Sequence, residues 1–266
     1  MSDRVVLLAG GQGSRLHPYR TIVPKPLLPV GDRSVLELTL CQLADHGFTD
    51  VTLAVGGLAG LIRALLGDGS GHGVRLRYAQ EHEPHGTAGV LKALDIDEPF
   101  LLMNGNVVTT LDYRALWDAH QASDNAVTIA THRREVVADY GVLRLNTDPN
   151  ARSVLGYVEK PASSYDVSMG VYAMQPEVRD YITSDEVLGL PELVNRLLAA
   201  GLQVGAFPFE GLWFDMRRRE DFELAQTRFD EIAPPSRRGR SLSVINGGLI
   251  SPELVALSPV AASNGR

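Results

Sequence analysis

Val5-Val6-Leu7-Leu8-Ala9 runs directly into Gly10-Gly11-Gln12-Gly13-Ser14-Arg15, and Pro24-Lys25-Pro26-Leu27 follows soon after. Five consecutive apolar residues are typical of a strand that is buried on both faces. Glycines directly after such a strand let backbone amides approach phosphate oxygens, and Arg15 and Lys25 add fixed positive charge nearby. The stretch therefore predicts a phosphate-binding turn at the carboxyl end of the first strand.

The spacing of these glycines excludes two common phosphate-binding motifs. The stretch contains neither G-x-x-x-x-G-K-[ST] nor G-x-G-x-x-G. A dinucleotide-dependent oxidoreductase is disfavoured further, because the second predicted strand ends in Val55-Gly56-Gly57 without an acidic residue. For the glycines alone, a plain structural turn remains an alternative.

The first half of the chain alternates strand and helix patterns. Ser34-Val35-Leu36-Glu37 predicts a capping box that opens a helix, and Gly47 is expected to stop it. Further strands are predicted over 51–55, 74–79 and 100–103, and further helices over 58–66 and 87–94. This order predicts an α/β fold with a mostly parallel, Rossmann-like sheet flanked by helices, whose ligands bind at the carboxyl ends of the strands.

The second half is predicted to form a smaller antiparallel extension beside that sheet. Strands are expected over 127–131, 142–145, 154–158, 171–174 and 204–207, and helices over 190–200 and 220–229. We expect one domain over residues 1–232. Residues 233–266 form a C-terminal tail whose end is expected to be flexible.

Composition narrows the function classes. The 266 residues carry 25 Lys and Arg against 32 Asp and Glu, a net charge of −7, which disfavours a nucleic-acid partner. Cys41 is the one cysteine, so an internal disulfide or a Cys-rich zinc site is excluded. No apolar run is long enough for a membrane span. A cytoplasmic protein without a membrane partner is expected.

The motifs together resemble the sugar-1-phosphate nucleotidylyltransferases, over about residues 4–230. The resemblance begins at the glycine-rich turn and Pro24-Lys25-Pro26-Leu27. It continues in order through Gly86-Thr87-Ala88-Gly89, Leu102-Met103-Asn104-Gly105, Tyr140-Gly141-Val142, Glu159-Lys160-Pro161, Gly170-Val171-Tyr172 and Trp213-Phe214-Asp215. The loop Glu83-Pro84-His85-Gly86 is most similar to that of mannose- and heptose-1-phosphate guanylyltransferases, which favours GTP over dTTP.

The resemblance implies transfer of a nucleoside monophosphate from a nucleoside triphosphate to a sugar 1-phosphate, with Mg²⁺ as cofactor. It implies a nucleotide-binding part at about 1–125 and a sugar-binding part at about 126–232. Arg15 and Lys25 would be catalytic. The implied nucleotide-binding residues are Leu8, Ala9, Gly10, Gly11, Gly13, Gln80, Gly86 and Thr87. The implied sugar-phosphate residues are Gly141, Glu159, Lys160 and Ser168, and the implied metal ligands are Asn106 and Asp215.

Structural alternatives exist for several of these residues. Lys25 is also consistent with a solvated loop lysine, Glu159-Lys160 with an exposed ion pair, and Asp215 with the cap of the next helix. The chain also departs from the family pattern at three places. Asn106 stands where the metal turn usually ends in Asp, Ser168 where Asn is usual, and Met216-Arg217 where Ile-Gly is usual.

These departures define a second hypothesis beside the enzyme. A chain with one carboxylate of the expected pair fits a catalytically impaired nucleotide-sugar-binding or regulatory homologue, whether Asn106 is natural or engineered. Retention of Arg15, Lys25, Lys160 and Asp215 favours the enzyme. The sugar is not identified by the sequence, and a homo-oligomer is left open.

Overall fold

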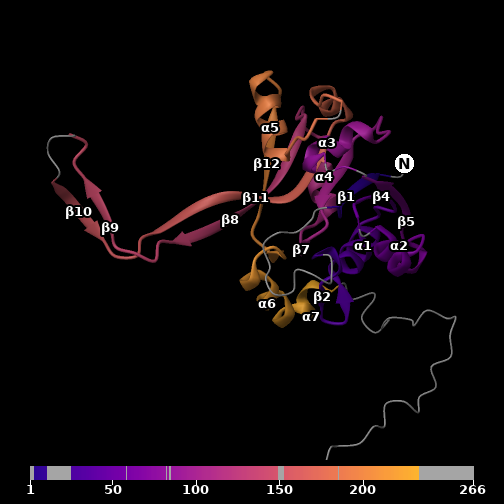
Figure 1. The fold of residues 1–266 in the computed structure, drawn as a ribbon, viewed down its shortest axis with the longest axis horizontal. Helices are drawn as coiled ribbons and strands as arrows, with labels where there is room; N and C mark the ends of the chain where they lie inside the picture. The colour runs from indigo at the N-terminus through magenta and orange to yellow at the C-terminus, as the bar shows by residue number, and fades with distance from the viewer. Residues whose placement is uncertain are drawn as a thin grey trace, which may run out of the picture.

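The computed structural model describes residues 3–10, 25–57, 59–81, 83, 85–148, 153–184 and 186–233. Figure 1 shows a layered body from which a long ribbon of strands projects to one side. The expectations for Gly11, Gly13, Arg15 and the tail beyond residue 233 lie outside the described residues.

A seven-stranded sheet forms the centre of the body, in the order β12-β8-β11-β6-β1-β4-β5. β1 pairs with β4 and β6 in parallel, and β4 pairs with β5 in parallel. β11 joins antiparallel to β6 and β8, and β12 runs parallel to β8. The strands are β1 (Arg4–Leu8), β4 (Asp50–Val55), β5 (Arg75–Gln80), β6 (Phe100–Asn104), β8 (Val127–Val137), β11 (Ala162–Met174) and β12 (Val204–Phe209). The predicted α/β class with a mostly parallel sheet is confirmed.

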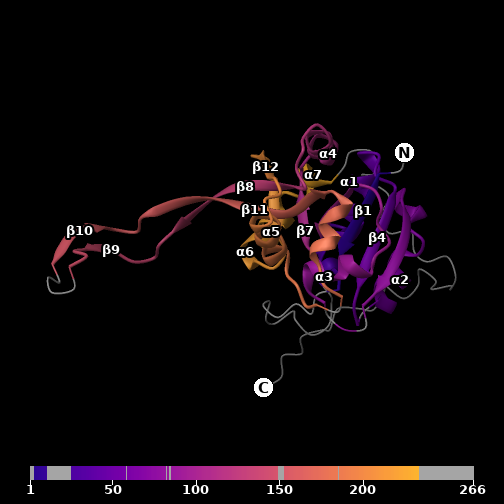
Figure 2. The ribbon, with the colours of Figure 1, turned by 90° about the horizontal axis from the view of Figure 1, so that it is seen from above.

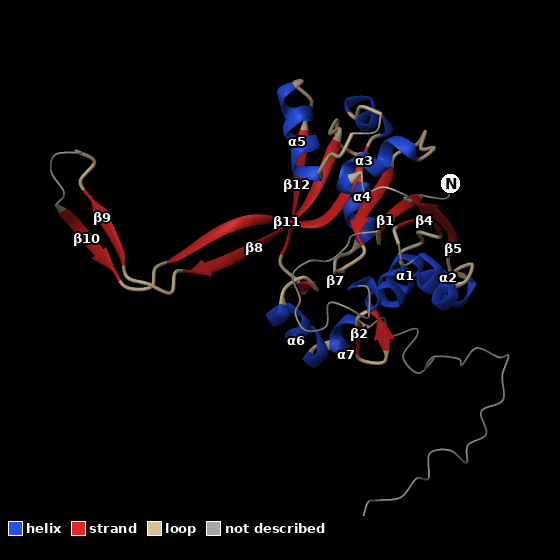
Figure 3. Ribbon diagram, viewed as in Figure 1, coloured by secondary structure: helices blue, strands red, loops and turns tan. Residues whose placement is uncertain are grey.

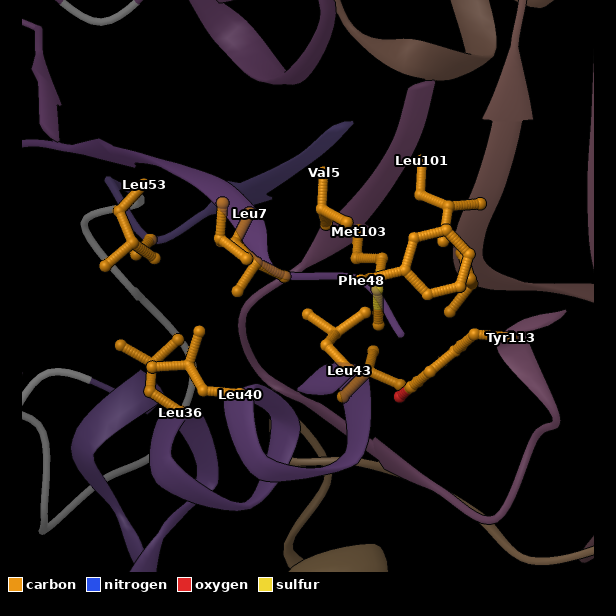
Figure 4. Packing of buried hydrophobic residues seen from close by; sticks show 14 of the residues in the cluster. Val5, Leu7, Leu36, Leu40, Leu43, Phe48, Leu53, Leu101, Met103 and Tyr113 are labelled. Carbon is orange, nitrogen blue, oxygen red and sulfur yellow. The ribbon is translucent and has the colours of Figure 1, made fainter. Parts of the chain in front are cut away.

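Helices cover both faces of the sheet. Along β1, Val5 and Leu7 point into one buried cluster and Val6 into the other, as a pleated strand buried on both sides requires. The first cluster contains residues of α1, α2 and α4, and Figure 4 shows Leu36, Leu40 and Leu43 of α1 packed under the strands. The second contains α3 and α5. The helices are α1 (Val35–Asp45), α2 (Ala59–Leu66), α3 (Gly86–Ala93), α4 (Tyr113–Gln121), α5 (Leu190–Ala199), α6 (Arg219–Thr227) and α7 (Phe229–Ile232).

The predicted capping box at the start of α1 is confirmed. The Glu37 amide donates to Ser34 Oγ at 3.3 Å, and the Ser34 amide donates to Glu37 Oε2 at 2.8 Å. These two bonds satisfy amides that the first turn of a helix leaves free. The helix ends before Gly47, whose φ of +83° suits glycine.

Several short elements lie beside α6 and α7, at the lower side of the body in Figure 1. β7 (Val107–Thr109) pairs antiparallel with β13 (Trp213–Asp215), and β2 (Pro29–Val30) pairs with β3 (Arg33–Ser34). The 3-10 turns are η2 (Lys25–Leu27), η3 (Ser70–His72) and η4 (Pro176–Tyr181). A third buried cluster joins these elements to α6 and α7. None of the helices in the described ranges is long and apolar enough to cross a bilayer.

The outer parts of β8 and β11, with the hairpin of β9 (Val142–Leu145) and β10 (Val154–Val158), form a segment that we call the arm, residues 133–166. The last pair that β12 makes is Phe209 with His132, so beyond that point β8 and β11 have only each other. Figures 1 and 2, viewed at right angles, both show β9 and β10 standing away from the body, and Figure 3 shows the arm built of strands and loops.

The arm corrects the expectation for the second half. β8 and β11 were expected over 127–131 and 171–174, but they extend to Val137 and start at Ala162. β8, β11 and β12 are part of the main sheet rather than an extension beside it. Of the five strands expected there, only β9 and β10 lie outside the main sheet, as a separate antiparallel pair.

Candidate active site

The carboxyl ends of the parallel strands converge around the start of the glycine-rich turn. Ala9 donates its amide to Ala54 O at 2.8 Å, and Gly105 donates to Leu8 O at 2.9 Å. The chain continues from β1 to β4 on one side, whereas β6 lies on the other side. Such a switch in strand order is where open α/β sheets bind ligands. The structure therefore places Leu8, Ala9 and Gly10 at the expected binding edge.

Gly10 is held between two neighbouring strands. A Cβ there would lie 2.7 Å from Glu81 Oε2 and 3.2 Å from the Gly56 amide nitrogen. The other carboxylate oxygen of Glu81, Oε1, is buried and has no hydrogen-bond partner among the described residues. Burial raises the pKa of Glu81 above its usual value, although the nearby His85 opposes this.

Glu81 was missed by the sequence reasoning, which singled out its neighbour Gln80. The Gln80 residue is exposed at the end of the edge strand β5. β5 ends at Gln80 and its burial does not alternate over its last residues, so the sequence position did not indicate which of the two side chains faces Gly10.

The start of α3 is anchored to the loop before α5. Gly86 has a φ of +78°, and a Cβ there would lie 2.4 Å from Leu188 O. The amides of Ala88 and Gly89 both donate to Leu188 O, at 2.9 and 3.2 Å. Thr87 Oγ1 accepts from the Leu190 amide at 2.9 Å. In this arrangement the helix start makes protein contacts, and the nucleotide-binding roles of Gly86 and Thr87 stay predictions.

The two predicted metal ligands are brought together. β7 and β13 pair next to them, and the Met216 amide donates to Asn106 O at 2.9 Å. The Asn106 Nδ2 amide donates to Asp215 Oδ1 at 2.8 Å. Arg217 Nε lies 2.9 and 2.8 Å from the two Asp215 oxygens, and Arg217 Nη2 donates to Oδ2 at 2.5 Å.

These residues, as arranged, do not fit Mg²⁺. Both oxygens of the one carboxylate already accept hydrogen bonds from Arg217, whose guanidinium cancels the charge of Asp215. Mg²⁺ is held in proteins by oxygen ligands, chiefly carboxylates. Among the described residues no group of three or more His, Cys, Asp or Glu side chains is placed to hold a metal. The metal role of Asn106 and Asp215 stays a prediction, and it requires Arg217 to move away.

The structure does not support the alternative that Asp215 caps α6. The residue at the N-cap position is Arg218, and the Asp215 side chain instead accepts the amide of Arg217 at 2.9 Å. The buried carboxylate and the half-exposed guanidinium thus form one unit at the end of β13.

A second ion pair contacts the backbone of Asp215. Asp221 of α6 is buried and accepts the Asp215 amide through Oδ2 at 2.8 Å. Arg134 binds the same carboxylate with two nitrogens, at 3.1 and 2.5 Å, and its guanidinium lies 4.4 Å from the Trp213 ring centroid. Because Arg134 belongs to the first residues of the arm, this network joins the arm to the candidate site. No sequence motif indicated it.

Ser168 lies on the body beside the end of β6. Its Oγ donates to the Tyr172 hydroxyl oxygen at 2.8 Å and accepts the Gly170 amide at 3.3 Å. Gly170 has a φ of +75°, and a Cβ there would lie 2.4 Å from Asn104 Nδ2. Burial raises the pKa of Tyr172, while the Ser168 hydrogen bond and the charge of Arg217 oppose the shift. Ser168 is therefore linked to Arg217 through Tyr172, and its sugar-phosphate role stays a prediction.

The other predicted sugar-phosphate residues lie on the arm. The Tyr157 hydroxyl donates to Glu159 Oε2 at 2.9 Å, and Gly141 is in close contact with the same Tyr157 hydroxyl. Lys160 is exposed and has a φ of +44°. Gly141, Glu159 and Lys160 are thus gathered with one another, but apart from the site on the body (Figures 1 and 2).

Lys25 begins η2 on the body. Its carbonyl accepts the Leu28 amide at 3.0 Å, and the following Pro26 and Leu27 are buried. The Leu28 carbonyl in turn accepts the amide of Val35 at the start of α1. The turn that carries Lys25 is therefore fixed to the core through the residues that follow it.

The chain matches the family model described as nucleotidyl transferase over residues 4–230. It belongs to this family. The nucleotidyl transferase chain is 30% identical over 240 residues to the UTP–glucose-1-phosphate uridylyltransferase of Synechocystis, covering 82% of this chain and 61% of the relative. It is 30% identical over 262 residues to the mannose-1-phosphate guanyltransferase of Saccharomyces cerevisiae, covering 93% of this chain and 71% of the relative.

The nucleotidyl transferase chain thus spans less than two thirds of the length of the cyanobacterial relative. Among solved structures, HddC from Yersinia pseudotuberculosis matches with a TM-score of 0.67 at 24% identity, covering 85% of this chain and 99% of HddC. HddC in complex with GMP-PN matches with a TM-score of 0.65 at 22% identity, covering 85% of this chain and 99% of that chain. At these identities the likeness supports the fold.

Proposed function

We propose that this nucleotidyl transferase uses a nucleoside triphosphate and a sugar 1-phosphate to make a nucleoside diphosphate-sugar and pyrophosphate. The observation that carries the proposal is the family match over 4–230 together with the position of Gly10, Asn106 and Asp215 at one edge of the sheet. The single domain over 1–232 is part of the same proposal.

The chemistry requires little from a general base. The second pKa of a phosphate monoester is about 6, so a sugar 1-phosphate is largely a dianion at neutral pH. One of its oxygens attacks the α-phosphorus, a new phosphorus–oxygen bond forms, and the bond to the bridging oxygen of the β-phosphate breaks. That oxygen leaves with its electron pair as part of pyrophosphate. Positioning and charge stabilisation should dominate the rate.

The positive charge for this step is assigned to side chains of the chain itself. Arg15 is proposed to contact the triphosphate and Lys25 the sugar phosphate. The Arg217 guanidinium is 57% exposed but is paired with the buried carboxylate of Asp215, so it would add positive charge to this step only after leaving that pair. No step is assigned to Mg²⁺, because both oxygens of Asp215 are already bound by Arg217.

We propose GTP as the preferred nucleotide, with dTTP next. The buried Oε1 of Glu81 has no hydrogen-bond partner among the described residues and lies 3.9 Å from His85 Nδ1. It supports GTP, because a carboxylate accepts hydrogen bonds and a guanine edge offers two adjacent donors, a ring N–H and an amino group. Thymine and uracil offer one donor there. Among the relatives, the yeast protein is named for guanyl transfer and the cyanobacterial one for uridylyl transfer.

The test is a panel of nucleoside triphosphates and sugar 1-phosphates assayed for pyrophosphate release. We expect release with at least one pair, fastest with GTP. Lys25→Ala should reduce the rate about ten- to a hundredfold, as the loss of one charge-assisted phosphate contact in the transition state predicts. No release with any pair, with or without Mg²⁺, would contradict the proposal.

The second hypothesis, an impaired nucleotide-sugar-binding homologue, is favoured by Asn106 and by the pairing of Asp215 with Arg217. It is separated from the first by Asn106→Asp in an Arg217→Gly background, which frees Asp215 and adds a second carboxylate. An enzyme that lacks only its second carboxylate should gain Mg²⁺ binding and at least about tenfold in rate, roughly 1.4 kcal/mol, whereas a binding or regulatory homologue should gain nothing. A chain that uses Arg217 should instead lose activity in the Arg217→Gly background.

A further inference from the structure

The arm exposes most of the large apolar side chains found on the described surface. Of sixteen such side chains, eleven lie between residues 136 and 165. They are Val136, Val137, Tyr140, Val142, Leu143, Leu145, Val154, Leu155, Tyr157, Val158 and Tyr165. Apolar patches of this size on a water-facing surface mark interaction sites.

The β9–β10 hairpin carries apolar pairs on both of its faces, and Arg144 is the charged residue of its ladder. Leu143 pairs with Tyr157, and the next pair along the ladder is Val142 with Val158. Successive pairs point to opposite faces of a two-stranded ribbon, so neither face is polar there. A hairpin with one face in water would alternate apolar and polar residues, whereas continuous apolar runs are typical of strands covered on both sides. An isolated two-stranded hairpin is also only marginally stable in water.

The strands that carry the hairpin hold it away from the body of its own chain. Five consecutive pairs, from Asp166↔Arg133 to Ala162↔Val137, continue beyond the last pair of β12 without a register shift. The shift in this ladder lies further back, between Ser168 and Tyr172. Folding the hairpin back over its own sheet would break these pairs, whereas contact with a second copy leaves them intact.

Lys160 indicates that the arm carries a functional site. Its φ of +44° is left-handed, and among the residues that the structure describes no other non-glycine residue has a positive φ. Such a conformation costs roughly 1–3 kcal/mol for a residue with a Cβ and clusters at binding sites. Glu159 and Lys160 are both exposed, and Tyr157 holds the Glu159 carboxylate in place. An exposed ammonium on a strained turn is suited to bind an anionic group such as a phosphate.

We propose that the arm inserts against the body of a second copy of this chain, where Glu159 and Lys160 complete the partner's sugar-phosphate site. The inference rests on the proposed function for the identity of that site. Eleven half-exposed side chains at roughly 80 Å² each amount to about 900 Å², close to the ~800 Å² per partner of a standard interface. Reciprocal exchange of two arms would form a closed two-fold dimer.

The test is a mixture of two variants that each have low activity. Lys25→Ala removes a body residue, and Lys160→Ala removes an arm residue. If sites are shared, each mixed dimer holds one site with both substitutions and one with neither. Random reassortment, achieved by co-refolding the two variants, should therefore restore about a quarter of wild-type pyrophosphate release, since half of the dimers are mixed. The matched control mixes Lys25→Ala with Asp215→Ala, two body variants, and should restore nothing.

Light scattering gives a readout that does not depend on activity. The wild type should have twice the 28.8 kDa mass of one chain. A Leu143→Asp, Tyr157→Asp variant should be a monomer with the circular dichroism spectrum of a folded protein. Failure of the wild type to release pyrophosphate while it remains a dimer would overturn the proposed function but not arm exchange. A wild-type monomer, or an active dimer whose body and arm variants do not complement, would overturn arm exchange.

Discussion

β1 in the body and β9 in the arm have nearly the same apolar character but opposite environments. Val5, Val6 and Leu7 are fully buried between two layers of helices, whereas all four residues of β9 are exposed. A continuous apolar run therefore predicts a strand that needs cover on both faces, but it does not say what provides the cover. In the body it comes from helices of the same chain. For the arm, we propose that it comes from another copy.

The largest expected difference between the two regions concerns matched Leu→Ala changes. Leu43 is fully buried in α1, while Leu143 in the arm is 48% exposed. Leu43→Ala should lower the free energy of unfolding by about 3–5 kcal/mol, because it removes apolar contacts and leaves a cavity. Leu143→Ala should change it by less than about 0.5 kcal/mol in dilute monomer. Urea denaturation of both variants checks this, and equal losses would contradict the distinction.

The ion pair between Arg134 of the arm and Asp221 of the body should give the next largest loss of stability when it is broken. Asp221→Ala leaves the Arg134 guanidinium without its carboxylate and the Asp215 amide without its acceptor. Because Arg134 is 23% exposed, we expect a loss of about 2–3 kcal/mol, less than for a fully buried pair. Thermal unfolding followed by circular dichroism measures it. Asp166→Ala, which breaks an exposed pair with Arg133 on the arm, serves as the control and should change stability little.

A smaller, pH-dependent effect is expected at Glu37 in the body. Burial raises the pKa of this carboxyl, but hydrogen bonds from His72 and Ser34 outweigh it and lower the pKa from 4.5 to about 2. A lowered folded pKa stabilises the fold above pH 4.5, and this stabilisation is lost as pH falls toward 2. Glu37→Gln should therefore cost about 2 kcal/mol at pH 7 and progressively less from pH 4.5 downward.

The matched change on the arm is Glu159→Gln. Glu159 is exposed, and the substituted side chain still has an oxygen that accepts the hydrogen bond of the Tyr157 hydroxyl. It should leave the unfolding free energy within about 0.5 kcal/mol of wild type across the same pH range. A pH-independent loss for Glu37→Gln would show that the capping box acts without its charge.

The smallest expected effect is a gain in stability at Lys160. Lys160→Gly removes the Cβ that makes a φ of +44° costly and should stabilise the chain by roughly 0.5–1 kcal/mol while lowering pyrophosphate release. Lys160→Ala removes the same charge but keeps the Cβ, so it should lower activity without the gain. Denaturation curves for the two variants, run side by side, distinguish relief of strain from loss of charge.

Much of the body was predictable from local pattern. The first strand, predicted over 5–9 and found at Arg4–Leu8, the Ser34–Glu37 capping box and the alternation of strand and helix each depend on short-range rules. α4 was missed although its buried residues Tyr113, Leu116, Trp117 and His120 have helical spacing, because its other residues are polar. The break between α6 and α7 at Arg228 was also missed.

The candidate site was less predictable than the fold, because side chains from distant segments form it. Asn106 and Asp215 were expected to meet, and they do. The pairing of Asp215 with Arg217 depends on side-chain geometry that sequence spacing does not specify. The position of Glu159 and Lys160 was unpredictable for a different reason: polar residues such as Arg133, Arg134 and Ser163 hide the continuation of β8 and β11 into the arm.

Amide hydrogen exchange in the arm tests the central claim most directly, because it reports whether β9 and β10 are covered without requiring substrate. We predict that amides over 142–145 and 154–158 are protected at high protein concentration and lose protection on dilution, while those of β1 stay protected throughout. Fast exchange of the arm at every concentration would contradict the claim that a second copy covers it. Protection of the arm that is independent of concentration down to the monomer would contradict it as well.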